Sequence, residues 1–353
     1  MSALLGLELG IRLLVETLWF SEVDYLSVLW RRMAVQGGVG GVAFLVSLAI
    51  FRAHLAHLTA QAEPVEPPLP KRRLPLAGLL AIVAFLGGSL GWVAWIYLQQ
   101  GAPLSKPWST LAAETAPLPT LPTVLAQGTS WPAGAIAAGL TLLLLALLRV
   151  RTWLRLMAWG LSICFGLLLA GHWPQFWELA AGIPFERTDP LFKRDLGFYV
   201  FQLPVWELLQ TWLLGLSLSV VLLLSVGYLL ARDNFSQGWF PGFTTAQLRH
   251  LYVAIGAVLL SLSGGHAIAR FKLLYSQRGA TYGASFTDVT LQLPLETVCA
   301  LVAASIALWL WLRAGFGGRN TTLRSRLHPR RRRLPWVGTP LLALGCYAVV
   351  LGA

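Results

Sequence analysis

The sequence predicts an all-α protein, a polytopic bundle of transmembrane helices with ordered, aromatic-rich loops outside the cytoplasm. Composition gives the first indication: 56% of the 353 residues are hydrophobic and only 12% are charged, about half the charge of an ordinary soluble domain. The second is a series of eight apolar stretches, each about as long as a bilayer is thick. The third is an unequal distribution of Lys and Arg between the loops that connect them.

Each apolar stretch is close to the roughly 20 residues that a helix needs to cross about 30 Å of hydrocarbon. We expect spans at residues 33–51, 74–98, 132–148, 153–173, 205–231, 250–269, 295–316 and 335–353. The third and fourth should form a tight hairpin, because Arg149, Arg151 and Arg155 would be costly in mid-membrane. Residues 1–32 then form an N-terminal segment, and residues 33–353 form the bundle.

Charged residues spaced by four mark the beginning of the chain. Glu8, Arg12 and Glu16 alternate with apolar residues in the first 17 positions, which is not the pattern of a cleavable signal peptide. The pattern predicts an amphipathic helix in the membrane interface. An incomplete first span is the competing explanation.

Lys and Arg gather in loops that stay in the cytoplasm. The loops after the first, third, fifth and seventh spans carry 16 of them, against 10 in the opposite set. This bias predicts that the Arg-rich loops are cytoplasmic and that the C-terminus is extracytoplasmic, in a bacterial plasma membrane or a thylakoid. Membrane topology therefore accounts for the net charge of +12 before any partner is invoked.

The most basic loop runs from Arg324 to Arg333, and a basic cluster beside a span typically contacts anionic lipid headgroups. Nucleic-acid binding is not expected, because no aromatic platform or folded basic domain accompanies the run. Cys164, Cys299 and Cys346 all fall inside predicted spans. They are too few for a disulfide framework and carry no metal-site spacing.

Three extracytoplasmic segments mix aromatic residues, Gly, Pro and isolated charges, unlike ordinary hydrophilic loops. An aromatic belt at headgroup level is the simplest interpretation of the first one. The alternating acids and bases of the second, residues 185–204, favour a self-paired surface network over a catalytic pair, and in the third Asp288 could pair with Arg278. The residues we expect to act in partner docking or in structure are Trp19, Phe20, Tyr25, Asp189, Pro190, Asp195, Phe198, Tyr199, Phe201, Tyr275, Tyr282 and Asp288.

These segments resemble, in order, a family of large uncharacterised multi-pass proteins of actinobacteria and cyanobacteria. The matching motifs are Leu18-Trp19-Phe20 with Tyr25, Asp189-Pro190-Leu191-Phe192 with Asp195, Gly197-Phe198-Tyr199-Val200-Phe201, Leu274-Tyr275-Ser276, and Gly283-Ala284-Ser285-Phe286-Thr287-Asp288-Val289. The run from Glu22 to Tyr25 looks like cyanobacterial members, although Asp24 stands where Gly is usual. The resemblance implies a helix bundle followed by a large extracytoplasmic domain, and it carries over no functional residues. This chain lacks a complete span before Leu18 and stops at Ala353, so it resembles the N-terminal membrane portion or a reduced member.

Five polar residues are expected near the extracytoplasmic ends of spans: His172, Glu207, His266, Arg270 and Glu296. Intramembrane charges are functional candidates by default, and these could line a shared outer vestibule. His266 allows three interpretations, which are a packing role, a ligand or ion path, and an axial ligand to chlorophyll, another pigment or haem. His172 allows the same three.

Ordered aromatic loops without a catalytic nucleophile or metal cluster favour a non-enzymatic subunit, scaffold or assembly factor. Such a protein would dock another membrane complex, photosynthetic or respiratory if the host is a cyanobacterium. The alternative is a transporter or channel with a polar vestibule. A membrane-embedded enzyme acting on lipid or cell-envelope substrates is the third hypothesis.

Overall fold

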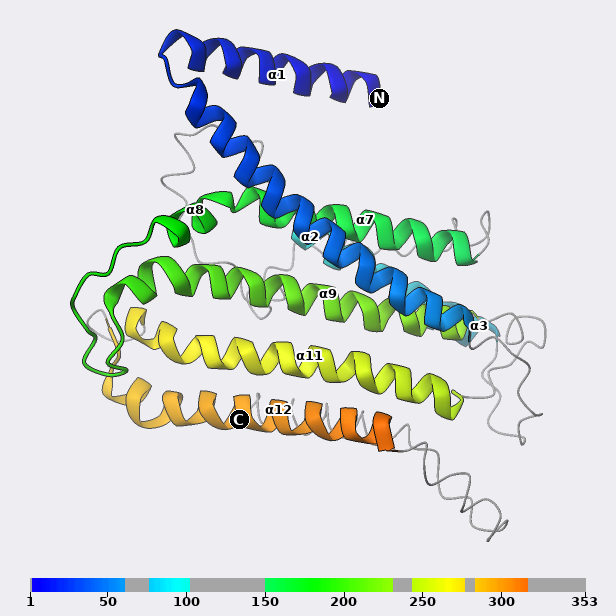
Figure 1. Cartoon of the computed structure of the whole chain (residues 1–353). Helices are drawn as coiled ribbons and strands as arrows, with labels where there is room; N and C mark the ends of the chain where they lie inside the picture. The colour runs from blue at the N-terminus through cyan, green and yellow to red at the C-terminus, as the bar shows by residue number, and fades with distance from the viewer. Residues whose placement is uncertain (1, 61–75, 102–149, 231–242, 277–282, 317–353) are drawn as a thin grey trace, which may run out of the picture.

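The computed structural model describes residues 2–60, 76–101, 150–230, 243–276 and 283–316, and within these ranges the chain is almost entirely helical (Figure 1). Six helices there are long and apolar enough to cross a membrane. The helices are α1 (Ser2–Glu22), α2 (Leu26–Ala60), α3 (Leu76–Gly101), α7 (Val150–Gly171), α8 (Trp173–Ala181), α9 (Leu203–Leu229), α11 (Thr245–Lys272) and α12 (Leu293–Phe316). Short turns are η3 (Phe198–Gln202), η4 (Leu273–Tyr275) and η5 (Asp288–Gln292), of which η3 and η5 are π-helical.

Six of the expected spans are confirmed as helices. They correspond in order to α2, α3, α7, α9, α11 and α12. The expected spans at 132–148 and 335–353 lie outside the described residues, as do Cys346 and the basic run that begins at Arg324. The largest difference is α2, which continues for 35 residues where a span of 19 was expected.

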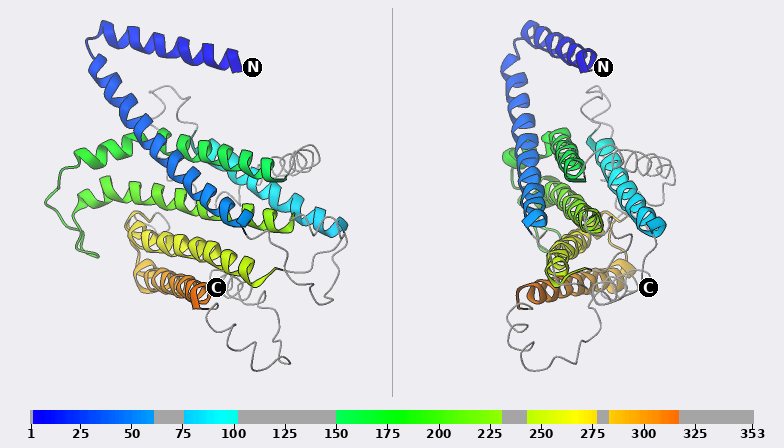
Figure 2. Two further views of the ribbon diagram at one scale, coloured as in Figure 1. Left: turned by 45° about the vertical axis from the view of Figure 1, so that its right-hand side comes forward. Right: turned by 90° about the vertical axis from the view of Figure 1, so that its right-hand side faces the viewer.

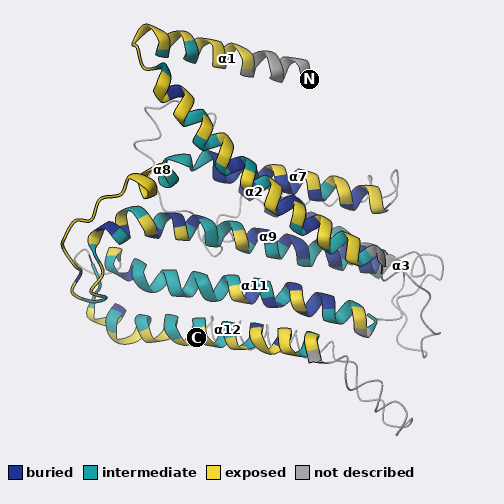
Figure 3. Cartoon of the chain, in the orientation of Figure 1, coloured by how far each residue is buried: buried dark blue, intermediate teal, exposed yellow. Residues whose placement is uncertain are grey.

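The core of the bundle lies where α2, α3, α7 and α9 pack together, with the first turns of α11 added (Figures 2 and 3). Trp153, Phe165 and Leu208 are fully buried there. A second, smaller apolar cluster joins α11 to α12. Cys164 and Cys299 are free and buried, as expected of small packing residues.

Small residues allow two close helix crossings. A Cβ on Gly40 of α2 would lie 2.8 Å from the Cβ of Ala170 and 3.0 Å from the carbonyl oxygen of Gly166, both on α7. A Cβ on Gly215 of α9 would overlap the ring of Tyr97, whose hydroxyl donates to the Thr211 carbonyl at 2.5 Å. Close approach of backbones through Gly is the usual way in which membrane helices gain packing contacts.

The N-terminal helix α1 is confirmed as a helix, but it runs roughly parallel to α9 rather than across the ends of the bundle (Figures 1 and 2). Whether it lies in the interface or forms an incomplete span stays a prediction. Its described contacts are chiefly with α2, to which it is tied by Glu16 and Arg32 at 3.4 Å.

Candidate docking surface and polar clusters

The connector that leads from α8 into α9 folds around one carboxylate. Oδ1 of Asp189 accepts from the amides of Leu191 at 2.8 Å and Phe192 at 2.6 Å. Oδ2 accepts from the Arg194 amide at 2.9 Å and from the Tyr199 hydroxyl at 2.8 Å. Only 4% of Asp189 is exposed, so this side chain fixes the loop as the expected turn at Asp-Pro.

A second carboxylate, Asp195, braces the same loop. Its Oδ1 accepts from the amides of Phe185 at 3.1 Å and Gly197 at 2.7 Å. Those amide bonds hold the pKa of Asp195 below its ordinary value. Burial opposes ionisation of Asp189, but its bonds from Phe192, Arg194, Tyr199 and Leu191 together lower its pKa as well.

The expected network of paired surface charges is therefore wrong for these two acids. Their partners are backbone amides and, for Asp189, a tyrosine hydroxyl, because the chain turns back on itself around these two side chains and buries Asp189. The Arg194 guanidinium lies instead over aromatic rings, 4.9 Å from the centre of Phe198 and 5.8 Å from that of Phe271. Glu186 and Lys193 adopt positive φ angles of 55° and 57° to make the turn, a conformation that few residues other than Gly favour.

The connector that leads into α12 uses a reciprocal cap. Asp288 accepts from the Ser285 amide at 3.0 Å, and the Ser285 hydroxyl accepts from the Asp288 amide at 3.2 Å. Asp288 is buried, with 4% exposed. The expected partner Arg278, and Tyr282, lie outside the described residues.

The two connectors end in the same way, a match that was missed in the sequence. The π-helical turn η3 runs into Gln202-Leu203-Pro204 at the start of α9, and η5 runs into Gln292-Leu293-Pro294 at the start of α12. Pro204 occupies the first turn of its helix, as expected. α7 with α9 and α11 with α12 therefore form two hairpins of similar construction whose connectors lie at one end of the bundle (Figure 1), which we call the connector end.

Aromatic rings join the first connector to α11. Phe198 lies 5.1 Å from Phe271 between ring centres, and Tyr199 lies 6.1 Å from Tyr275. Phe201 stacks on Phe185 at 6.0 Å. Five of the expected docking or structural residues thus hold the connector together: Asp189, Asp195, Phe198, Tyr199 and Phe201.

Apolar side chains remain exposed on this braced surface. Ile183 is 73% exposed and Phe185 49%, both in the first connector, and Phe286 is 82% exposed in the second. The turn between α1 and α2 lies toward the same end (Figures 1 and 2) and exposes 60% of Trp19 and 61% of Tyr25. Phe20 packs edge-on against Trp19 at 4.9 Å. We call Ile183, Phe185 and Phe286 the apolar rim.

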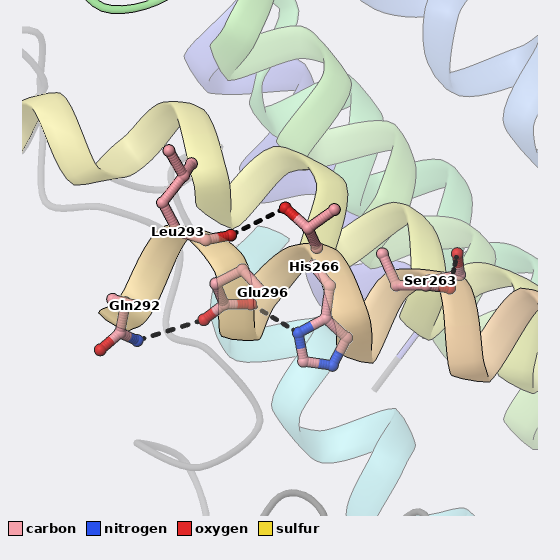
Figure 4. Close-up of polar contacts among 7 residues, drawn as sticks. Ser263, His266, Gln292, Leu293 and Glu296 are labelled. Atoms are coloured by element: carbon pink, nitrogen blue, oxygen red, sulfur yellow. Dashed lines mark hydrogen bonds and ion pairs between the residues drawn. The ribbon is translucent and has the colours of Figure 1, made fainter. Parts of the chain in front are cut away.

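Two acid–base pairs tie the hairpin α11–α12 and helix α9 together in the half near the connectors. Nδ1 of His266 lies 2.6 Å from a carboxylate oxygen of Glu296, whose other oxygen accepts from Gln292 at 3.3 Å (Figure 4). Lys272 donates to Glu207 at 2.5 Å. The structure thus brings together one pair of the expected intramembrane groups, His266 and Glu296, and pairs the expected Glu207 with Lys272, which was missed in the sequence; each pair lies across a helix interface.

Arg270 and His172 are placed differently. The Nε atom of Arg270 is buried and has no hydrogen-bond partner among the residues that the structure describes. His172, the residue between α7 and α8, bonds through Nδ1 to the Leu168 carbonyl of α7 at 2.8 Å. This bond engages His172 with the end of α7.

A histidine cluster at the opposite end of the bundle was missed in the sequence. His54 and His57 lie near the end of α2, and His250 lies near the start of α11. Nδ1 of His54 is 2.7 Å from Nε2 of His250, and Nδ1 of His250 is 2.6 Å from the hydroxyl of Tyr228 on α9. The spacing of His54 and His57, one helical turn apart, was the available signal. We call this the histidine end.

Within the described ranges no group of three or more His, Cys, Asp or Glu side chains is arranged to hold a metal ion. The features described in these ranges are paired helices, hydrogen-bonded side chains and an exposed apolar rim.

The chain resembles a set of proteins without an assigned activity. The model of the uncharacterised protein family UPF0182 matches residues 1–351. A UPF0182 protein of Synechocystis is 33% identical over 99% of this chain and 37% of its own length. The UPF0182 protein of Microcystis aeruginosa is 32% identical over 89% of this chain and 34% of its own length. The UPF0182 protein of Synechococcus elongatus is 33% identical over 96% of this chain and 36% of its own length. The chain spans about a third of the length of these relatives. No solved structure matches it.

Proposed function

Because the chain belongs to the uncharacterised UPF0182 family, we propose a function from its geometry: it is a non-enzymatic membrane scaffold or subunit that docks another membrane protein through its connector end. The observation that carries this proposal is the apolar rim, held on loops that are fixed by buried carboxylates. A loop kept only as a linker would need neither the enclosed Asp189 nor the capped Asp288.

The rim suits a protein partner on physical grounds. Exposed apolar residues on a rigid surface lose little conformational entropy when they bind, so most of their burial energy is retained. Fully burying one Phe side chain contributes about 1.5 to 3 kcal/mol, and large anchors of this kind dominate interfaces. The three relatives described above come from cyanobacteria, so photosynthetic and respiratory complexes are the first partners to test.

Replacing Phe286 by Asp tests the docking proposal. When this variant is purified from native membranes in mild detergent, we expect the amount of copurifying partner to fall by about tenfold or more. The reason is that a charge replaces an apolar anchor that the interface would bury. Native gel migration and quantitative mass spectrometry measure the loss. Thermal unfolding should be unchanged, since 82% of Phe286 is exposed.

Phe286→Leu is the matched control, because it keeps an apolar side chain and should keep the partner. Migration of the wild-type protein as an isolated monomer, together with normal assembly of host complexes after deletion of the gene, would contradict docking.

We infer an orientation from the Lys and Arg count: the connector end is extracytoplasmic and the Arg324–Arg333 run is cytoplasmic. Ser276→Cys should react with a membrane-impermeant maleimide on intact cells, and Ser325→Cys should react only after lysis. Both are made in a background in which Cys164, Cys299 and Cys346 are replaced by Ala. The reverse labelling pattern would show that the inferred orientation is inverted.

Transport is the second candidate function, favoured by the two acid–base pairs between α9, α11 and α12. Against it, residues 251–260 of α11, which lie between these pairs and His250, carry no charged side chain. This uncharged stretch is about 15 Å long, because an α-helix rises 1.5 Å per residue. A continuous polar path along α11 is therefore interrupted.

If transport is nevertheless the function, Glu296→Gln should abolish substrate or ion flux in proteoliposomes, because it removes the acid partner of His266. Arg313→Gln, at the far end of α12, is a control that should transport normally. Flux through Glu296→Gln equal to that of wild type would remove these pairs from any transport path.

A further inference from the structure

The histidine end contains a hydrogen-bonded chain of three side chains from three helices. Tyr228 of α9 bonds to Nδ1 of His250, and Nε2 of His250 bonds to Nδ1 of His54. The imidazole rings of His54 and His250 are stacked, 5.0 Å apart with an interplanar angle of 12°. Both ring nitrogens of His250 are thus engaged.

The chain of bonds determines how many protons the two imidazoles can hold. A neutral imidazole has one donor and one acceptor nitrogen, so a neutral His54 and a neutral His250 can share one N–H between them. One added proton is accommodated on Nε2 of His54, while Nδ1 of His54 donates to Nε2 of His250 and Nδ1 of His250 donates to the Tyr228 oxygen. A second added proton places two N–H groups, and two positive charges, against each other across 2.7 Å.

Among the described residues near this end, the charged groups do not compensate a doubly charged pair. The His57 ring lies at 84° to that of His250, with 4.7 Å between ring centres. Tyr228 is bonded to His250 at 2.6 Å. The charged residues near this end of the described helices are Arg52 on α2, Arg151 and Arg155 on α7, Arg249 on α11 and Arg313 on α12. No Asp or Glu lies near this end in the described part of the helices, so like charges would repel without a nearby counter-charge.

The pair also bridges helices that share little else. α2 packs mainly on α7, and α11 packs mainly on α12 and α9. The bond between His54 and His250 is therefore a principal direct contact between α2 and α11. Its loss would leave both main helix pairs intact and weaken the link between the two helix ends, where His57 also contacts His250.

We propose that His54, His250 and Tyr228 form a proton-operated clasp between α2 and α11. The clasp is closed while the two imidazoles hold at most one proton beyond the neutral pair. It opens when both are protonated, so acidification separates the end of α2 from the start of α11. The residues that carry this proposal are separate from those of the connector end, so either proposal can fail without the other.

Paired spin labels at the histidine end test the clasp. Ala53→Cys on α2 and Ala246→Cys on α11, both exposed positions, are labelled in the full-length protein with its three native cysteines replaced. Between about pH 8 and about pH 4, the distance distribution should change from one population to two, the new one longer, because a second proton on the pair is taken up below the ordinary histidine range. His54→Gln should lose this pH response, because an amide does not titrate.

His172→Gln is the matched control, because His172 lies outside the clasp, and it should respond to pH as wild type does. An unchanged distance distribution in wild type across this range overturns the proposal, as does an equal pH response in His54→Gln.

A second measurement applies even where His54→Gln folds poorly. Histidine-selective ¹⁵N NMR of the wild-type protein should show scalar coupling across the bond between His54 and His250 at about pH 8, and none at about pH 4. Coupling that persists at the lower pH overturns the clasp.

Discussion

Asp189→Asn is expected to open the connector between α8 and α9 while the bundle stays helical. An amide keeps one acceptor oxygen, so the Arg194 amide or the pair of amides at Leu191 and Phe192 loses its acceptor. Unpaired donors and the loss of charge-assisted bonds together lower the free energy of opening the connector by about 3 kcal/mol. Hydrogen exchange of these amides should accelerate about 100-fold, as measured by mass spectrometry of peptides covering residues 186–200.

Asp24→Asn is the matched control. Asp24 is exposed and has a φ of 59°, a conformation that Asn adopts readily. It makes the same chemical change without removing an enclosed acceptor, so exchange in the connector should stay at the wild-type rate. Wild-type exchange in Asp189→Asn as well would show that the carboxylate does not hold the loop.

Gly215→Ala is expected to destabilise the core by about 2 kcal/mol, since overpacking a filled interface typically costs 1 to 3 kcal/mol. The new methyl group would overlap the ring of Tyr97 and displace its hydroxyl from the Thr211 carbonyl. The melting temperature in detergent should fall by roughly 5 °C. Circular dichroism at increasing temperature measures the change.

The comparison for this variant is Gly160→Ala on α7. Gly160 is exposed and a Cβ there meets nothing within 4 Å, so only helix propensity changes, in favour of Ala. Its melting temperature should equal or slightly exceed that of wild type. Equal melting temperatures for the two variants would mean that α9 and Tyr97 do not pack as closely as described.

The spans could be predicted because length and hydropathy are local properties of the sequence. The limits of α2 could not, because Arg31, Arg32 and Arg52 resemble boundaries of a span although the helix continues past them. A helix needs no hydrocarbon to continue, and long basic side chains reach the interface from within it. Hydropathy therefore locates the part in lipid and not the ends of the helix.

The candidate sites depended on contacts that no local pattern contains. His54 and His250 are 196 positions apart, and nothing near either residue indicates the other. Enclosure of Asp189 requires positive φ angles at Glu186 and Lys193. Neither residue is Gly, so the sequence does not indicate these angles. The shared Gln-Leu-Pro of the two hairpins was readable, but so short a motif gives no signal of fixed period.

α11 is one continuous helix of 28 residues, about 42 Å long. Near its first turns is His250, and near its last is Phe271, against which Phe198 of the first connector rests. A straight helix that tilts changes direction along its whole length, so a tilt that starts at His250 also changes the angle at which Phe271 meets Phe198. The aromatic contacts of the first connector are therefore sensitive to the orientation of α11.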